Sequence, residues 1–274
     1  MRAPRPVGTA IDTRRRSSWQ RRFASYRQGV TEQGIIDWLD AFENGDRDTA
    51  ARLLDAVEFI SAEQIHGAFR SILSILPGWH READKRRGKF VFVAFSTSAG
   101  ESGDNMLHQF RLANSLNHRE FDPLFIGRSD LLRAGLGSED TVVFVDDFVG
   151  SGTQAVTAWE KMFQELTTEV GNVYLATIAA YKVGSDAIKA KTRMQLLAHR
   201  PLGYRHSLFR NECDHFTAKE KERILHYCQL ASTKHPKGFG DCALAVVLYH
   251  QCPNNALAVL HAASRRWDPL FPRS

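Results

Sequence analysis

Long apolar runs and paired cysteines are both missing from the sequence. No apolar run approaches about 18 residues, the length that a membrane-spanning helix needs, so we expect no contact with a membrane. The four cysteines, Cys213, Cys228, Cys242 and Cys252, form no Cys-x-x-Cys pair. Scattered cysteines of this kind indicate reduced thiols and a cytoplasmic protein. A zinc site that uses Cys213, His215 and Cys228 stays open as an alternative.

Acidic residues are almost missing from the first 27 residues, where Asp12 is the one acid. The same segment contains Arg2, Arg5, Arg14, Arg15, Arg16, Arg21, Arg22 and Arg27, and the formal net charge of the chain is +5. A basic segment of this kind is typical of nucleic-acid or polyanion binding. A transit peptide and a solvated flexible arm over residues 1–18 are the alternatives.

One stretch combines a buried strand, two acids and a small-residue loop. The run Val142–Val145 is β-branched and aromatic, as in a parallel strand covered on both faces, and Asp146 and Asp147 follow it directly. The loop Gly150–Gly152 then leads to Thr153 and a helical pattern, so backbone N–H groups can converge on an anion. Two carboxylates would repel a phosphate, and we therefore expect them to bind sugar hydroxyls or a metal.

Neighbouring side chains in a strand point to opposite faces of the sheet. Asp146 and Asp147 can therefore reach one ligand only if the strand ends at Asp146, which the sequence analysis predicts. An ordinary strand-turn-helix with Thr153 as the N-cap is the alternative to a ligand site.

Three other nucleotide or phosphate sites do not fit this stretch. The chain has no Gly-x-x-x-x-Gly-Lys-Ser/Thr loop, which a P-loop NTPase requires. An aspartyl phosphatase usually has a second Asp two residues after the first, but Phe148 stands there. A dinucleotide fold has its glycine loop before the acid, and here the acids come first.

The order of strand, Asp-Asp, two apolar residues and a small-residue loop resembles the phosphoribosyl-diphosphate motif of type I phosphoribosyltransferases. The resemblance implies an α/β fold with a mostly parallel central sheet and helices on both faces. It implies that Asp146 and Asp147 hold the ribose 2′- and 3′-hydroxyls and contact Mg²⁺ indirectly, through these hydroxyls or water. The residues implied to bind the 5′-phosphate are Val149, Gly150, Ser151, Gly152, Thr153 and Gln154.

A second loop rich in small residues follows the predicted buried strand Phe90–Phe95. The residues that the resemblance implies for the diphosphate are Ser98, Ala99, Gly100, Glu101, Ser102 and Gly103. The family often has Lys or Arg in this loop, but no basic residue stands between Phe95 and His108. Because a leaving diphosphate needs cationic groups and Mg²⁺, binding without turnover becomes an alternative, and a flexible connection is another.

A further strand, predicted at residues 172–180, ends at Tyr181 and Lys182. The family places base-recognition residues at this position, so the resemblance implies that Tyr181 stacks on a nucleobase and Lys182 meets a carbonyl or phosphate. The alternative is a surface pair without a binding role.

The remaining pattern predicts helices near residues 19–30, 35–42, 50–59 and 61–75, whose aromatic residues we interpret as core. We expect a basic arm at 1–18, a helical region at 19–84 and a phosphoribosyltransferase-like domain at 85–274. Ala243–Tyr249 reads as one more buried strand, with Pro253-Asn254-Asn255 as a turn that could lie over the ligand. Over about 90–260 the chain is similar to the phosphoribosyltransferase-like proteins of bacterial conflict and anti-phage defence systems, including some that accompany retrons.

The resemblance leads to one expected function and two alternatives. We expect a phosphoribosyltransferase-like protein that binds 5-phosphoribosyl-1-diphosphate or a related nucleotide and serves in an anti-phage defence system. The alternatives are an active Mg²⁺-dependent phosphoribosyltransferase of nucleotide metabolism and a protein that associates with nucleic acid through its Arg-rich N-terminus. That N-terminus is also the expected contact for a defence-system protein partner, and a homo-oligomer is a further expectation.

Overall fold

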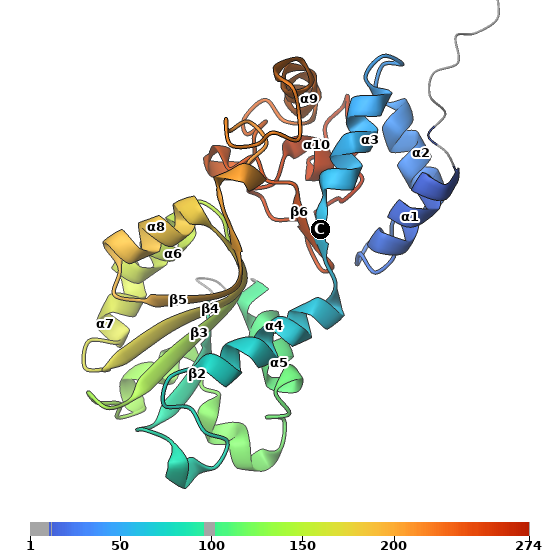
Figure 1. Ribbon diagram of the computed structural model, residues 1–274. Helices are drawn as coiled ribbons and strands as arrows, with labels where there is room; N and C mark the ends of the chain where they lie inside the picture. The colour runs from blue at the N-terminus through green and yellow to red at the C-terminus, as the bar shows by residue number, and fades with distance from the viewer. Residues whose placement is uncertain (1–10, 12, 96–101, 274) are drawn as a thin grey trace, which may run out of the picture. The chain divides into compact units, whose positions relative to one another are not determined.

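The computed structural model describes residues 11, 13–95 and 102–273 and divides the chain into two compact units. Unit 1 comprises Met1–Ala62 together with Tyr204–Ser274, and unit 2 comprises Glu63–Gly203 (Figure 1). The two ends of the chain therefore belong to one folded unit, and the middle of the chain forms the other.

These units differ from the domains expected from the sequence. The expected boundary at residue 85 falls inside unit 2, and the expected domain 85–274 is shared between the two units. The expected arm 1–18 is also helical from Thr13 onward, where α1 (Thr13–Phe23) begins. Helical periodicity reveals that a segment is a helix but not which distant segment it packs against, which explains the difference.

Unit 2 contains a four-stranded parallel sheet with the order β2-β3-β4-β5. Its strands are β2 (Phe90–Ala94), β3 (Thr141–Val149), β4 (Asn172–Tyr181) and β5 (Gln195–Leu202). On the edge of β2 away from β3, Phe92 forms a parallel bridge with Phe125. The chain thus passes from β2 outward to Phe125 and then returns to β3, so the direction of winding reverses between β2 and β3. The predicted parallel α/β fold is confirmed.

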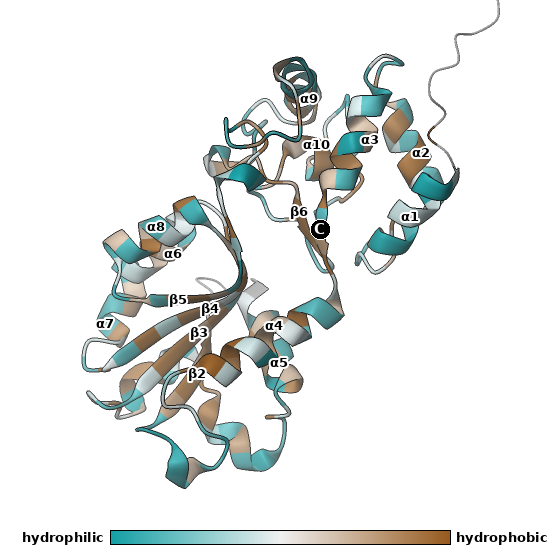
Figure 2. Cartoon of the chain, viewed as in Figure 1, coloured by the Kyte–Doolittle hydropathy of each residue, from teal (hydrophilic) through white to brown (hydrophobic). Residues whose placement is uncertain are grey.

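Helices cover both faces of this sheet (Figure 1). On one face lie α4 (Ala62–Ile75) and α5 (Ser102–Ala113), and Phe110 of α5 contacts Phe92 with ring centroids 5.0 Å apart. The other face carries α6 (Thr153–Ala158), a π-helical turn (Trp159–Phe163), α7 (Gln164–Leu166) and α8 (Lys182–Lys191). Of the strands between these layers, β2, β3 and β4 are strongly apolar, whereas β5 is mixed (Figure 2).

Short 3-10 helices complete unit 2. They span Ala83–Lys85, Arg119–Leu124 and Arg128–Arg133. The second of them ends just before Phe125, which forms the isolated bridge to β2.

Unit 1 packs helices from both ends of the chain around a two-stranded sheet. Its helices are α1, α2 (Glu32–Asp40), α3 (Arg47–Ala56), α9 (Ala218–Ala231) and α10 (Ala258–His261), with 3-10 turns at Tyr204–His206 and Phe239–Asp241. The parallel strands are β1 (Glu58–Ile60) and β6 (Val246–Leu248).

One prediction about this unit is wrong, and another is confirmed in part, because β6 is a buried strand within the predicted range. The third helix ends at Ala56, and Phe59 lies in β1 opposite Val247. The buried strand expected at Ala243–Tyr249 pairs with β1, not with the central sheet, so the turn Pro253-Asn254-Asn255 belongs to unit 1. Apolar runs indicate that a strand is buried but do not identify its partner strand.

Aromatic residues join the two ends of the chain in the core of unit 1. Trp38 donates a hydrogen bond from its indole to the carbonyl of Val259 at 3.2 Å and contacts the Trp267 ring at 6.1 Å. Phe23 meets Phe271 edge to face at 5.0 Å. The interpretation of the N-terminal aromatics as core is therefore confirmed.

The cysteines are buried thiols without a disulfide. Burial raises the pKa of Cys228 to about 12 and that of Cys242 to about 11, so both stay protonated at neutral pH. Among the described residues no three His, Cys, Asp or Glu side chains are placed to hold a metal ion, so the zinc alternative is wrong. In the same part of the chain, none of the helices has both the length and the apolar character that crossing a bilayer requires.

Candidate functional site

The acid pair lies in β3, beside the point where the winding of the sheet reverses. β2 and β3 are parallel neighbours, so their carboxyl ends lie at the same edge of the sheet. Ligands of open α/β sheets bind in the crevice outside these ends, where the strand order reverses. The acid pair and the small-residue loop predicted from the sequence lie at this end of β3.

The sequence predicted that the strand ends at Asp146, and this prediction is wrong. β3 continues to Val149, and Asp146 is paired with Thr177 of β4. The pairing of β3 with β4 skips Asp147 and Ile178 but keeps the same register on either side, at Asp146 with Thr177 and at Phe148 with Ala179. Phe144 and Val149 belong to the same hydrophobic cluster, although side chains five residues apart in a regular strand point to opposite faces. An irregular step of this kind re-aims side chains at the end of a strand.

The two carboxylates differ in exposure. Asp146 is 7% exposed, and its Oδ1 accepts a hydrogen bond from the backbone N–H of Asp147 at 2.9 Å. Asp147 is half-buried. One acid is therefore fixed against the backbone at the irregular step, and its neighbour is the more accessible of the two.

The loop after β3 turns sharply at Gly152, which has a φ of 78°. Gly152 is the N-cap of α6 and Thr153 is its first helical residue, so the alternative in which Thr153 is the N-cap is wrong. The Ser151 hydroxyl donates to Thr153 Oγ1 at 3.0 Å, and the Thr153 N–H donates to Ser151 Oγ at 3.4 Å. Val149 and Gly150 are buried, and Thr153 and Gln154 are exposed. The loop therefore has a buried base and an accessible hydroxyl pair at the start of the helix.

Gly184 supports this loop from α8, and the sequence analysis did not select it. A Cβ at Gly184 would lie 2.3 Å from the carbonyl oxygen of Gly150 and 2.9 Å from the nitrogen of Gly152. A Cβ at Gly152 would lie 2.9 Å from the Cα of Gly184, so the two backbones are in direct contact. A single glycine within a helical pattern, here in the first turn of α8, was the available signal for such a close approach.

Most of the candidate diphosphate residues, Ser98, Ala99, Gly100 and Glu101, lie outside the described residues. Ser102 and Gly103 open α5. A Cβ at Gly103 would lie 2.7 Å from the carbonyl oxygen of Phe95, so α5 begins directly against the end of β2. The close contact places the start of α5 at the crevice.

Tyr181 and Lys182 lie at the carboxyl end of β4, next to β3, where Tyr181 is buried and Lys182 is exposed. Tyr181 is 1% exposed, and the Lys182 ammonium binds both oxygens of Asp186 at 2.9 Å. Stacking on a nucleobase would require the Tyr181 ring to leave its buried position. The Lys182 ammonium is exposed and has three N–H donors, so it can contact a ligand while it stays paired with Asp186.

The acid pair has the chemistry that indirect Mg²⁺ binding requires. Mg²⁺ prefers oxygen ligands, keeps several waters and is usually bound by one or two carboxylates together with substrate phosphates. Asp146 and Asp147 supply two carboxylates, and no third acid joins them in a metal cluster among the described residues. They fit Mg²⁺ held through ribose hydroxyls or water.

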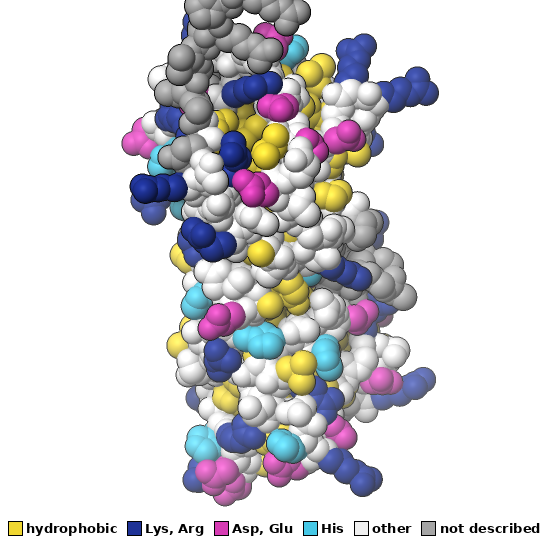
Figure 3. Space-filling model, turned by 90° about the vertical axis from the view of Figure 1, so that its right-hand side faces the viewer, with side chains coloured by type: hydrophobic (Ala, Val, Ile, Leu, Met, Phe, Trp, Pro, Cys, Tyr) yellow, Lys and Arg dark blue, Asp and Glu magenta, His cyan; other side chains and the backbone are white. Residues whose placement is uncertain are grey.

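The arginines of α1 are used mainly inside unit 1. Arg15 binds Asp55 at 2.5 Å, Arg16 lies 3.4 Å from Glu32, and Arg22 donates to the backbone carbonyls of Leu54 and Asp55. Arg14 and Arg21 remain exposed. On the face in Figure 3, acidic side chains stand between the basic ones, so no extended surface of one charge appears there.

The parallel sheet, the acid pair and the glycine loop after β3 together define a phosphoribosyltransferase-like α/β protein. A comparison with protein families gives the same result. The family model described as PRTase-CE matches residues 35–273, and the chain belongs to this family. The comparison with curated proteins gives no match.

Proposed function

We propose that the protein binds 5-phosphoribosyl-1-diphosphate, or a closely related nucleotide, at the carboxyl end of β3. The observation that supports this most is the contact of Gly150 and Gly152 with Gly184, next to the acid pair. A loop held this closely keeps its backbone amides in a fixed arrangement without a ligand. Preorganised amides bind an anion at a lower entropic cost than a loop that must be ordered first.

The 5′-phosphate would bind the amides of the loop and the hydroxyls of Ser151 and Thr153. Asp146 and Asp147 would accept hydrogen bonds from the ribose 2′- and 3′-hydroxyls. Each charged acceptor forms a stronger hydrogen bond than a neutral one, so the acids select a pentose that carries both hydroxyls. Mg²⁺, when bound, would neutralise charge on the diphosphate.

If the protein is a transferase, the bond between C1 and the diphosphate oxygen breaks while a nitrogen nucleophile attacks C1. Positive charge develops on the ribose, and the carboxylates of Asp146 and Asp147 stabilise it. The sequence supplies no Lys or Arg between Phe95 and His108 for the leaving diphosphate. The absence of a base in this segment favours binding without turnover.

Calorimetry with 5-phosphoribosyl-1-diphosphate, with and without Mg²⁺, tests the binding proposal. A diphosphate-release assay on the same samples, with a panel of nucleobases, separates binding from transfer. We expect saturable binding that Mg²⁺ strengthens. Heat without saturation at millimolar ligand would contradict the proposal, and release of diphosphate would identify an enzyme.

A role in anti-phage defence and a nucleic-acid contact through the N-terminus stay predictions. The binding site at β3 requires neither of them. The internal ion pairs of Arg15 and Arg16 leave fewer arginines for a polyanion than the sequence indicated.

A further inference from the structure

Unit 1 contains a cavity of about 350 Å³ whose lining residues all belong to that unit. Cavities that bind small ligands begin at about 300 Å³, so this one has room for a small molecule. It is lined by residues of α3, β1, the start of β6 and the segment 205–216. None of the residues proposed for the phosphoribosyl site lines this cavity.

Part of the cavity lining is apolar and buried. Leu208, Phe216 and Val246 line it, and each is buried, with an exposed fraction of 3%, 6% and 2%. The Arg52 guanidinium lies over the Phe216 ring at 5.3 Å. Buried apolar side chains around a cavity of this size favour a flat ring, because the ring replaces water against an apolar surface.

The acids of the lining are already paired within the protein. Asp55 binds Arg15 at 2.5 Å and accepts a hydrogen bond from the Trp19 indole at 2.8 Å. Glu58 also has a partner. The Asp55 carboxylate is therefore not available to attract a cationic ligand without losing an existing interaction.

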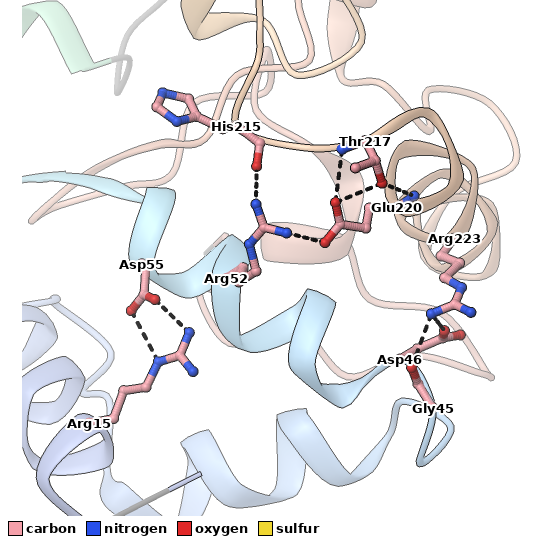
Figure 4. A network of polar contacts seen from close by, with 9 residues as sticks. All are labelled: Arg15, Gly45, Asp46, Arg52, Asp55, His215, Thr217, Glu220 and Arg223. Atoms are coloured by element: carbon pink, nitrogen blue, oxygen red, sulfur yellow. Dashed lines mark hydrogen bonds and ion pairs between the residues drawn. The ribbon is translucent and has the colours of Figure 1, made fainter. Parts of the chain in front are cut away.

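Two of the basic lining residues are also engaged. The Arg52 guanidinium binds Glu220 and donates to the carbonyl of His215 (Figure 4), and His206 has a partner as well. By contrast, Arg205 and the His215 imidazole form no hydrogen bond or ion pair within the described part of the chain. Figure 4 shows the His215 ring pointing away from Arg52. The nitrogen donors that remain for a ligand are thus Arg205 and His215, and both are exposed.

We infer that this cavity binds a small anion that carries an aromatic ring, of the size of a nucleoside monophosphate. The ring would pack on Leu208 and Phe216, and the phosphate would accept hydrogen bonds from Arg205 and His215. Arginine suits this role because its planar guanidinium matches two phosphate oxygens. The inference goes beyond the proposed function and does not depend on it.

Calorimetry of the full-length protein with AMP as the probe tests this inference. We expect AMP to bind wild-type protein, and a variant with Arg205→Gln and His215→Gln to bind it at least about tenfold more weakly, since two charge-assisted hydrogen bonds are lost. Lys219→Gln removes an exposed base that does not line the cavity and should leave the affinity unchanged. Adenosine and inorganic phosphate should each bind more weakly than AMP.

A variant with Asp146→Asn and Asp147→Asn separates this cavity from the proposed phosphoribosyl site. It should keep the wild-type affinity for AMP, because those acids lie in unit 2. Loss of AMP binding in that variant, or unchanged binding in the variant at Arg205 and His215, would overturn the inference. If inorganic phosphate binds as tightly as AMP, the proposed contribution of the ring to the affinity is wrong. If millimolar AMP does not bind at all, the proposal that this cavity is a ligand site is wrong.

Discussion

At the scale of single residues, the acid pair and the loop after β3 could be predicted because their signal is local. Two acids after an apolar run and a glycine beside hydroxyl residues are visible within about a dozen positions. The role of Gly184 was not predictable in the same way, because its contact is with Gly150, more than 30 residues away in the sequence. The burial of Tyr181 also depends on packing around β4 that no local pattern reports.

Gly184→Ala should weaken binding of 5-phosphoribosyl-1-diphosphate. The new Cβ would lie 2.3 Å from the Gly150 carbonyl oxygen and 2.7 Å from Val149 Cγ1, so the loop must move away from α8. We expect affinity to fall by about tenfold or more in calorimetry, since the displaced amides no longer converge on the phosphate.

Gly67→Ala is the matched control for this change. Gly67 lies in α4 of the same unit, and a Cβ there would meet nothing within 4 Å. Alanine in a helix is more favourable than glycine by up to about 1 kcal/mol, so stability should rise slightly and affinity should not change. Equal ligand affinity in both variants would show that the contact with Gly184 does not hold the loop.

At the scale of elements, the helical layer behind the acid pair depends on Phe163. This residue is fully buried, and its ring meets Phe144 at 4.3 Å and Phe95 at 4.9 Å. It therefore joins the π-helical turn after α6 to the strands β2 and β3. The spacing of apolar residues predicted a helix here. That spacing does not distinguish a π-helical turn from an α-helical one.

Phe163→Ala should lower the free energy of unfolding by about 3–5 kcal/mol, because it leaves a cavity between helix and sheet. Urea unfolding measured by circular dichroism checks this value. Phe163→Leu keeps most of the volume and should cost much less. A loss below about 1 kcal/mol for the alanine variant would contradict the packing described for this layer.

The arginines of α1 separate into two groups that the sequence does not distinguish. Arg22 donates to backbone carbonyls at the end of α3, whereas Arg21 is exposed without such a contact. Arg22→Gln should therefore destabilise the protein by about 1–2 kcal/mol, the range for hydrogen bonds from a charged donor.

Arg21→Gln provides the comparison for that substitution. It removes the same charge and should change stability by less than about 0.5 kcal/mol. Thermal unfolding of both variants at equal salt checks the pair. Equal losses would mean that charge, not the contact with α3, determines the effect.

At the scale of the whole molecule, the sequence predicted the fold class but not the division of the chain. The parallel sheet followed from apolar strands that alternate with helical patterns. The sequence did not predict that the two ends of the chain, Met1–Ala62 and Tyr204–Ser274, form one unit. That unit depends on contacts between distant residues, such as Trp38 with Val259, which are 221 residues apart. The family match over residues 35–273 includes most of both units, so the family model is not limited to the parallel sheet of unit 2.

Deletion of residues 204–274 should unfold the N-terminal helices. They would lose Trp267 and Phe271, on which Trp38 and Phe23 pack. Limited proteolysis should then cut within residues 13–56, which the full chain should protect. Continued protection of that segment after the deletion would contradict the description of unit 1 as one folded unit.

The most direct test of the account is the affinity for 5-phosphoribosyl-1-diphosphate after Asp146→Asn and Asp147→Asn, measured by calorimetry with Mg²⁺. Glu139→Gln is the control, because it removes an exposed acid just before β3, at the opposite end of the strand. The account predicts a loss of about a hundredfold in the double variant, with an unchanged circular dichroism spectrum, and wild-type affinity in the control. Wild-type affinity in the double variant would contradict it.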